Sequence, residues 1–417
     1  MRLVLIGCLL GCWLGFIGAA RAQGRVSGVV QDSVTHEPLA FSSVFLANTT
    51  LGVTTNEQGQ FSFDRVPRGT YDIVGSYVGY KLSKQHITVG TAPQTVTLAL
   101  ASAGPKLDEV VVKASAHAAD DYRRFADVFL GQSANSRQCR ITNPGDVDVA
   151  YNDSTQELTA QASTYLQVEN QALGYRIKYY GLRFAHDTSE GGGTIFDGQT
   201  VFEEMTPKDA TQRQQWAAAR AAAYYGSLTH FLKSVRDNRL KSEGYLAQQV
   251  KVTPNRRYVQ ADTLRQRLLR RLHGRAPSDV QQDSMARLMS VLNNAAPVLA
   301  SIQPGAQPID SLRRVSADRE HVYLRFRQEL QVAYFGEAPD PHYDQPMSPL
   351  GRTKATYPAQ REVSRLKLSD VEVEILPSGA LADPLAVQVG EYWGFEKTGE
   401  FLPLDYVPPG HSAVPLP

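Results

Sequence analysis

The chain has 417 residues, of which 42% are hydrophobic, and its 43 basic and 42 acidic side chains leave a net charge of +1. This length suggests two or three domains of roughly 150 residues each. A near-neutral charge gives no general reason to expect nucleic acid or an anionic surface as a partner. The composition is therefore that of a globular protein and argues against a nucleic-acid-binding class.

The first 22 residues predict export. A basic start, Met1-Arg2, precedes an apolar run over residues 3–20, and Ala20-Arg21-Ala22 provides the small-x-small pattern that signal peptidase accepts. We expect cleavage after Ala22. No second apolar run of spanning length follows, so we expect a mature chain without a transmembrane segment, located in the periplasm or associated with the outer membrane or cell surface.

Two alternatives to cleavage stay open. Residues 3–20 are nearly as long as the roughly 20 residues that a membrane-spanning helix needs. Cys8 and Cys12 each follow a Leu-x-Gly sequence, which is a pattern for lipid attachment. Removal of residues 1–22 would leave Cys139 as the single cysteine, so the exported chain would depend on core burial rather than on an internal disulfide.

Residues 24–101 predict an all-β sandwich of seven short antiparallel strands. Phe61 and Phe63 flank Ser62, so both rings should enter one core face. Gly28 interrupts a strand, which indicates a bulge or a close backbone approach. Asn56-Glu-Gln-Gly59 predicts a hairpin turn in which Gly59 takes a positive φ. The other strand segments are expected at residues 39–46, 71–73, 77–80 and 95–100.

A dense motif set runs through this region: Gly28, Val30, Asp32, Pro38-Leu39, Val44, Gly52, Thr54-Thr55, Gly59-x-Phe61, Pro67-x-Gly69-x-Tyr71 and Gly79-Tyr80. It resembles the carboxypeptidase regulatory-like domain, a transthyretin-like β-sandwich of exported Bacteroidetes proteins. The resemblance implies a module that accompanies a zinc peptidase in its namesakes and carries no catalytic groups itself.

Residues 102–120 predict a linker that contains the strand-like segment Leu107-Asp-Glu-Val-Val-Val112. This segment resembles the one that joins the same module to the plug of TonB-dependent outer-membrane receptors. Its function there would be recruitment of a partner by strand addition, and the alternative is a strand packed against the next domain. A receptor of that kind needs a long series of ~10-residue amphipathic strands, which the helical segments at residues 209–240 and 262–294 would interrupt.

Residues 121–410 predict an α+β domain of mixed antiparallel sheet and helices. A short amphipathic helix is expected over residues 122–130, one long helix over 209–240, and a helical zone over 262–294 with a break at 274–277. Strands are expected at residues 147–151, 157–162, 165–168, 175–184, 194–202, 321–334, 363–376 and 386–394.

This second region carries its own motif set: Phe129-Leu-Gly131, Cys139, Ile141-x-Asn143-Pro144, Leu173-Gly-Tyr175, Phe202-Glu203, Tyr225-Gly-Ser-x-x-His230-Phe-Leu232 and Leu402-Pro-x-Asp405-Tyr. It resembles the uncharacterised second region of Bacteroidetes envelope proteins that share the N-terminal module. That resemblance implies no known reaction.

The motifs of familiar hydrolases are missing. A zinc carboxypeptidase needs a His-x-x-Glu pair, and the nearest match is His117 with Asp120 in the predicted linker. The Gly-x-Ser-x-Gly nucleophile elbow is absent, and Ser227 lies in a predicted helix. Residues 191–193 are three glycines without the Lys-Ser/Thr of a phosphate loop.

Three other features have a structural and a functional interpretation. Cys139 is either a nucleophile or a small core residue. The segment 224–232, which includes His230, mixes phenols, a hydroxyl and an imidazole, and it is explained equally well as the buried face of a helix. Arg265, Arg267, Arg270, Arg271 and Arg275 form a basic patch that could meet lipid phosphate or an acidic partner, or be a solvated helix face.

Taken together, these patterns predict a signal peptide (1–22), a β-sandwich (24–101), a linker (102–120) and an α+β domain (121–410). The expected function is non-catalytic binding of an outer-membrane protein or a glycan in the cell envelope. We assign no catalytic, cofactor-binding or metal-binding residue and expect no cofactor. The alternative is an envelope hydrolase with an unrecognised site, which converging carboxylates in a cleft or Cys139 beside His230 would favour.

Overall fold

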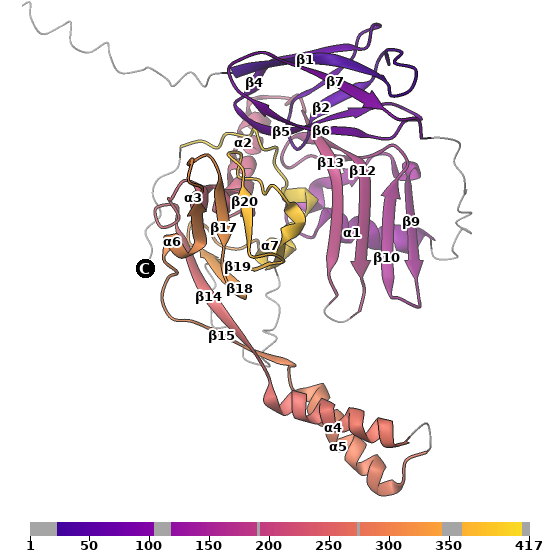
Figure 1. The fold of residues 1–417 in the computed structure, drawn as a ribbon, viewed down its shortest axis with the longest axis vertical. Helices are drawn as coiled ribbons and strands as arrows, with labels where there is room; N and C mark the ends of the chain where they lie inside the picture. The colour runs from indigo at the N-terminus through magenta and orange to yellow at the C-terminus, as the bar shows by residue number, and fades with distance from the viewer. Residues whose placement is uncertain (1–22, 104–117, 190–191, 273–275, 344–360, 411–417) are drawn as a thin grey trace, which may run out of the picture. The chain divides into compact units, whose positions relative to one another are not determined.

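The computed structural model describes residues 23–103, 118–189, 192–272, 276–343 and 361–410 (Figure 1). These residues divide into two compact units: the part before residue 104 together with Gln199–Val201, and the remainder. The α+β class with an N-terminal all-β sandwich is confirmed. The expected signal peptide and the segment 107–112 lie outside the described residues.

The first unit contains seven strands, the number predicted, in two sheets. One sheet has the order β4-β1-β7 and the other β3-β2-β5-β6. β1 pairs antiparallel with β4 but parallel with β7, so the sandwich is not wholly antiparallel as the sequence suggested. The strands are β1 Gln23–Asp32, β2 Ser43–Leu46, β3 Gly52–Thr54, β4 Gln60–Pro67, β5 Gly69–Ser76, β6 Ser83–Val89 and β7 Gln94–Leu100.

Apolar side chains at alternating positions of these strands point inward and form the core of the first unit. Phe61 and Phe63 are both buried, with their ring centroids 6.0 Å apart in an edge-on arrangement, as expected. A Cβ at Gly28 would lie 1.8 Å from the backbone oxygen of Val96, which confirms the close approach. Two strand predictions are wrong: residues 77–80 form a turn after β5, and Phe41 is an exposed turn residue with a φ of 58°.

The turn before β4 has the positive φ predicted at Gly59, but it is not the predicted hairpin, because β3 and β4 belong to different sheets. The Gly59 amide donates to the backbone oxygen of Asn56 at 2.9 Å, and the Asn56 side chain accepts from the amides of Gln58 and Gln60. Gly59 has a φ of +70°, and a Cβ there would lie 2.6 Å from the backbone oxygen of Val30. Only glycine fits this position without strain.

The second unit opens with helix α1 (Ala118–Leu130), which packs on a sheet of order β8-β11-β12-β10-β9, with β13 paired to β12. Phe125 and Phe129 of α1 are fully buried, and Phe129 meets the ring of Tyr179 edge-on at 5.2 Å. This helix and the five strands predicted after it are present. These five strands are β9 Val147–Asn152, β10 Glu157–Ala162, β11 Tyr165–Asn170, β12 Tyr175–Asp187 and β13 Thr194–Glu204, and the sheet also contains β8 Cys139–Ile141, which was not predicted.

The predicted helix over residues 209–240 is wrong in one respect, because two helices occupy it. Helix α2 (Ala210–Tyr224) ends at a break where Gly226 has a φ of +87°. Helix α3 (Leu228–Arg236) begins behind Ser227, whose side chain accepts from the His230 amide. A positive φ at glycine ends a helix and a serine N-cap starts the next one.

Two further sheets complete the second unit, with orders β15-β14-β18-β19-β21 and β16-β17-β20. Two of the predicted strand segments are each divided into two strands: 321–334 forms β17 and β18, and 363–376 forms β19 and β20. The segment 386–394 forms β21, which is followed directly by the short helix α7. Strands β14, β15 and β16 and the short helix α6 were not predicted. Their bounds are β14 Tyr245–Pro254, β15 Val298–Ile302, α6 Ile309–Leu312, β16 Arg313–Val315, β17 Val322–Arg325, β18 Glu329–Tyr334, β19 Glu362–Leu368, β20 Glu372–Ile375, β21 Val387–Glu391 and α7 Tyr392–Phe395.

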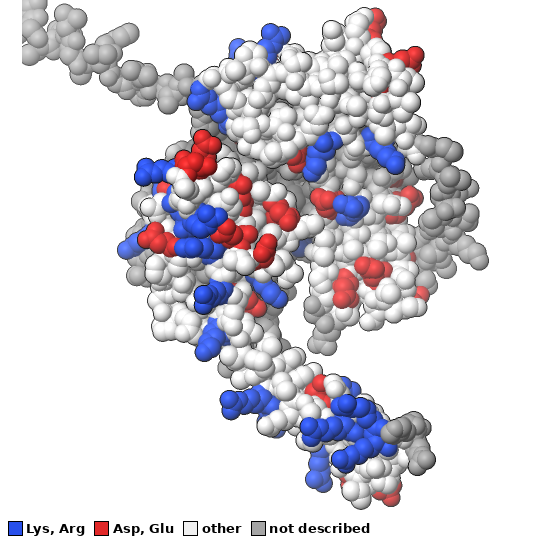
Figure 2. Space-filling view, viewed as in Figure 1, with Lys and Arg blue, Asp and Glu red and all other residues white. Residues whose placement is uncertain are grey.

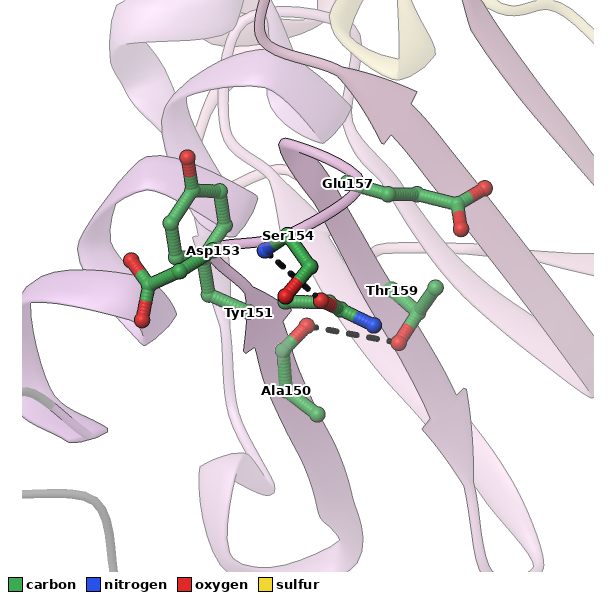
Figure 3. A pocket seen from close by; sticks show the side chains of 7 residues that line it. Ala150, Tyr151, Asp153, Ser154, Glu157 and Thr159 are labelled. Atoms are coloured by element: carbon green, nitrogen blue, oxygen red, sulfur yellow. Dashed lines mark hydrogen bonds between the residues drawn. The ribbon is translucent and has the colours of Figure 1, made fainter.

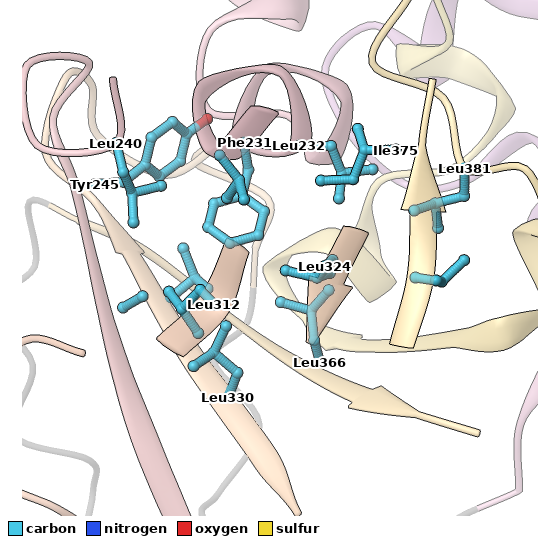
Figure 4. Packing of buried hydrophobic residues seen from close by; sticks show 14 of the residues in the cluster. Phe231, Leu232, Leu240, Tyr245, Leu312, Leu324, Leu330, Leu366, Ile375 and Leu381 are labelled. Atoms are coloured by element: carbon cyan, nitrogen blue, oxygen red, sulfur yellow. The ribbon is translucent and has the colours of Figure 1, made fainter. Parts of the chain in front are cut away.

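Helix α3 covers the core of these sheets. Phe231 and Leu232 point from α3 onto side chains of the strands, among them Leu324, Leu330 and Leu366 (Figure 4). The predicted helical zone is confirmed as a hairpin of α4 (Arg256–Leu272) and α5 (Asp279–Asn294) inserted between β14 and β15. Among the described residues, no helix combines the length and apolar character needed to cross a membrane.

Candidate functional site

Four glutamates from separate segments gather in the second unit. Glu337 follows β18, Glu362 opens β19, Glu396 directly follows α7, and Glu400 ends the single turn Thr398–Glu400. We call Glu337, Glu362, Glu396 and Glu400 the glutamate cluster. The sequence analysis missed it because these residues are spread over more than 60 positions with no regular spacing.

Burial raises the pKa of every member of the glutamate cluster, and a neighbouring carboxylate adds to each shift: another member for Glu337, Glu362 and Glu396, and Asp340 for Glu400. The pKa of Glu337 rises to about 8, first through burial and then through Glu400. Burial followed by the charges of Glu396 and Glu337 raises the pKa of Glu362, and burial followed by Glu400 raises that of Glu396. Like charges in a low-dielectric environment oppose ionisation, so the cluster retains protons near neutral pH.

Glu362 links the glutamate cluster to the break between α2 and α3. Its side chain is 5% exposed, and its Oε2 has no hydrogen-bond partner among the described residues. Its carboxyl group also meets the Tyr392 hydroxyl. A Cβ at residue 226 would lie 2.2 Å from Glu362 Oε2, so Gly226 provides the room for this carboxyl.

The loop that follows α1 donates hydrogen bonds to Glu400 of the glutamate cluster and to the nearby Asp340. Glu400 accepts hydrogen bonds from the Ser133 hydroxyl and, at 2.8 Å, from Asn135 Nδ2. Asp340 accepts from the Ala134 amide at 2.8 Å, and its own amide donates to the Tyr392 hydroxyl at 3.1 Å. The carboxyl groups are thus positioned by donors, which is a property shared by acid–base sites and by structural polar networks.

His230, singled out from the sequence, is buried on α3 among tyrosines. Its Nδ1 lies 2.9 Å from the Tyr245 hydroxyl, and its Nε2 lies 3.4 Å from Glu243 Oε2. The rings of Tyr224 and Tyr334 lie 5.1 Å and 5.8 Å from the imidazole. Ser227 caps α3 rather than facing a substrate. These contacts favour the structural interpretation of the segment.

Cys139 has an environment opposite to that of a nucleophile. Its thiol points to the backbone oxygen of Asn135 at 3.5 Å, and burial together with the charge of Glu400 raises its pKa to about 12. Catalytic cysteines have lowered pKa values, because the thiolate is the reactive form. Cys139 instead packs beside the core of the first sheet of the second unit.

We therefore expect Cys139→Ala to leave partner binding unchanged. The thiol of the native chain should react with iodoacetamide at pH 8 at least tenfold more slowly than a free cysteine, because the thiolate is scarce at that pH. Mass spectrometry of the alkylated chain measures the rate, with the urea-unfolded chain as reference. Rapid alkylation of the native chain, or loss of a measurable activity in the variant, would support a role of Cys139 as a nucleophile.

One group of described residues has metal-ligand spacing. The side-chain ligand atoms of Asp318, Glu320 and His321 all lie within 4.8 Å of one another in an exposed turn. His321 also meets Glu374 at 2.7 Å, and Asp318 accepts from Ser316. These local bonds account for the turn, and acidic surface turns are common without a metal. The glutamate cluster does not reach this spacing among the described residues.

A surface hollow of about 540 Å³ lies at the turn between β9 and β10 (Figure 3). Within it, Asn152 Oδ1 accepts from the Ser154 amide at 3.0 Å, and the Thr159 hydroxyl donates to the Ala150 oxygen at 3.3 Å. Asp153 and Glu157 are exposed there. These bonds account for the hollow as part of a hairpin turn.

Comparison with solved structures gave only weak likenesses. The pilus 2b backbone protein of group B streptococcus matches at 18% identity and a TM-score of 0.18, over 19% of this chain and 41% of that one. A Bacteroides uniformis protein proposed to bind carbohydrate matches at 10% identity and a TM-score of 0.16, over 44% of this chain and 99% of that one. A protein of unknown function from Bacteroides fragilis matches at 11% identity and a TM-score of 0.15, over 75% of this chain and 87% of that one. Scores this low support no argument about fold or function.

Family models gave a firmer result for the first unit. A comparison with curated proteins found no significant match. Residues 26–112 match the model of the CarboxypepD_reg-like domain, which extends beyond β7 into the segment 107–112. The N-terminal segment at residues 26–112 is therefore similar to the CarboxypepD_reg-like domain, as its motif set indicated.

Proposed function

We propose that this is an exported cell-envelope protein that binds an outer-membrane protein or a glycan without converting it. The observation that carries the proposal is the match of residues 26–112 to the CarboxypepD_reg-like domain. This part of the chain has a hydrophobic core of its own. In this domain two buried polar side chains, Ser42 and Thr55, both donate hydrogen bonds to the Leu39 backbone oxygen, at 3.0 Å and 2.9 Å. A rigid module of this kind is suited to presenting a surface.

One end of the sandwich offers such a surface. Val34 and Val78 are 82% and 78% exposed, and they lie in two turns that the Tyr80 hydroxyl joins by donating to Asp32 at 2.8 Å. Tyr77 lies beside Tyr80 with ring centroids 5.5 Å apart. Exposed apolar and aromatic side chains on rigid turns are typical of recognition surfaces for proteins and sugars. We call Val34, Tyr77 and Val78 the turn surface.

The proposal is tested by crosslinking the full chain in envelope fractions and identifying what it captures. We expect one stoichiometric partner that rebinds the purified chain, and at least tenfold weaker binding for Val34→Ser/Val78→Ser. Val371→Ser/Leu385→Ser is the matched control, because these exposed apolar residues belong to the second unit. Equal loss of binding in both double variants, or conversion of the captured molecule, would contradict the proposal.

Export is tested separately by fractionation and by sequencing the mature N-terminus. Cleavage after Ala22 should leave Gln23 as the first residue. A lipidated N-terminus at Cys8 or Cys12 would contradict cleavage at this site but not export. A cytosolic chain that retains residues 1–22 would contradict both.

The glutamate cluster favours a second candidate, a hydrolase that uses carboxyl groups. A carboxyl with a pKa near 8 carries a proton at neutral pH and could donate it to a leaving group. If this candidate holds, Glu337→Gln should reduce the release of reducing ends from envelope polysaccharides at least a hundredfold. Glu157→Gln, at an exposed site of the same unit, should not. Absence of turnover by the wild-type chain would dismiss this candidate.

A further inference from the structure

The hairpin of α4 and α5 stands apart from the rest of the second unit. It extends from the ends of β14 and β15 (Figure 1), and each helix packs mainly on the other. None of its residues belongs to a core cluster of the second unit, and Ala261 is its one buried residue among those described. Fold stability therefore does not explain the composition of this hairpin.

Charge is strongly segregated into this hairpin. Residues 256–294 contain eight arginines and three aspartates, whereas the rest of the chain contains 35 basic and 39 acidic residues. Basic side chains cover much of the visible face of the hairpin (Figure 2). Arg265 forms an ion pair with Asp262 at 2.7 Å. Arg270 instead donates a hydrogen bond to the backbone oxygen of Gln266 at 3.4 Å. The net charge of the whole chain is close to zero because a basic hairpin is combined with a slightly acidic remainder of the chain.

Apolar side chains lie exposed among these arginines. Leu264 and Leu269 of α4 are 51% and 47% exposed, and Val280 in the first turn of α5 is 76% exposed. Leu268 and Leu272, which follow the helical spacing of the α4–α5 seam, are only half-buried. Leu269, Arg270 and Arg271 lie in the last turn of α4, and Val280 lies in the first turn of α5. The basic and apolar groups are thus both found at the end of the hairpin where α4 ends and α5 begins.

We propose that the α4–α5 hairpin docks on a membrane surface rich in anionic lipid. Arginines would contact headgroup phosphates while Leu269 and Val280 enter the boundary with the acyl chains, as in amphipathic helices that lie in a bilayer interface. An acidic protein would satisfy the arginines but would not require exposed leucine and valine beside them. A second copy is disfavoured because two hairpins with an excess of basic charge repel each other.

The test is flotation of the full chain with phosphatidylcholine vesicles that contain or lack phosphatidylglycerol. We expect binding only to the anionic vesicles, and its loss at about 1 M salt, where the screening length falls to roughly 3 Å. Arg267→Gln/Arg270→Gln/Arg271→Gln should weaken binding about 100-fold, at roughly fivefold for each arginine near the surface. Leu269→Ser/Val280→Ser should weaken it about tenfold while leaving the net charge unchanged.

The matched control is Arg65→Gln/Arg68→Gln/Arg213→Gln, which removes the same charge from exposed positions outside the hairpin. It should bind vesicles as the wild type does. A second variant replaces residues 256–294 by a short turn joining β14 to β15. It should keep the thermal unfolding midpoint and lose vesicle binding.

Three outcomes would overturn the proposal. The first is wild-type binding to anionic vesicles that both arginine variants weaken equally, because the effect would then be one of total charge. The second is hairpin-dependent binding to heparin or to an acidic protein without binding to vesicles. The third is a hairpin-dependent dimer in solution that does not float with vesicles. Because the readout uses defined lipid, it is independent of whether the turn surface has a partner.

Discussion

The second unit is expected to lose stability as the pH rises from about 5 to about 8. The pKa of Glu337 is raised from 4.5 to about 8, and burial with repulsion from neighbouring carboxylates also raises those of Glu362, Glu396 and Glu400. A carboxyl with a raised pKa keeps its proton in the folded chain at a pH where it has lost it in the unfolded chain. Between the two pKa values the folded state binds more protons, so the free energy of unfolding falls as the pH rises.

Glu337→Gln should flatten this dependence. The amide is neutral at every pH, so the variant should resemble the wild type near pH 5 and exceed its stability at pH 8 by about 2–4 kcal/mol, given that one pKa unit corresponds to about 1.4 kcal/mol. Trp216 and Trp393 are both buried in the second unit, so thermal unfolding followed by tryptophan fluorescence reports on it. The difference between variant and wild type removes the contribution of other titrating groups, such as His321, whose pKa Glu374 raises.

The control is Glu157→Gln, at an exposed position of the same unit. It should leave the pH dependence of the wild type unchanged. Two results would contradict the prediction: a lower unfolding midpoint for Glu337→Gln than for the wild type at pH 8, or a stability advantage of the wild type over Glu337→Gln that grows from pH 5 to pH 8. Either result would mean that the carboxyl of Glu337 is ionised and paired in the folded chain. The burial argument would then be wrong.

Gly59→Val should destabilise the first unit by about 3 kcal/mol or more. Valine at positive φ costs of the order of 1–3 kcal/mol, and its Cβ would also meet the Val30 oxygen at 2.6 Å. In a domain of this size such a loss lowers the unfolding midpoint by more than ~10 °C. Hydrogen exchange of the amides in β1 and β4 measures it, because β4 follows the turn and pairs with β1, and the Val30 amide donates to the Gly59 oxygen.

Two other glycines of the same unit separate the causes. Gly79 has a φ of +83° with nothing within 4 Å of a built Cβ, so Gly79→Val should show the cost of the backbone conformation alone. Gly90 has neither a positive φ nor a close neighbour, so Gly90→Val should have little effect. Equal protection in Gly59→Val and Gly90→Val would show that the turn relaxes freely, against the assignment of a tight turn at Gly59.

The first unit was predictable because its signals are local. Alternation at Phe61 and Phe63 needs only neighbouring residues to assign a face, and Asn56 with Gly59 determines a turn within four positions. The parallel pairing of β1 with β7 was missed because strand order depends on segments some 70 residues apart. Gly226 and Ser227 did contain the signal that divides α2 from α3, but the continuous apolar stripe of residues 216–235 outweighed it.

The sequence by itself determined the class of the fold, the sandwich with its turns, the helical hairpin and the group of arginines on it. Each of these follows from residue types a few positions apart, and such spacing is converted into structure by backbone geometry alone. The tertiary structure decided the glutamate cluster, the burial of His230 and the high pKa of Cys139. Desolvation and repulsion depend on which distant segments exclude water together, and no local pattern in the chain specifies that.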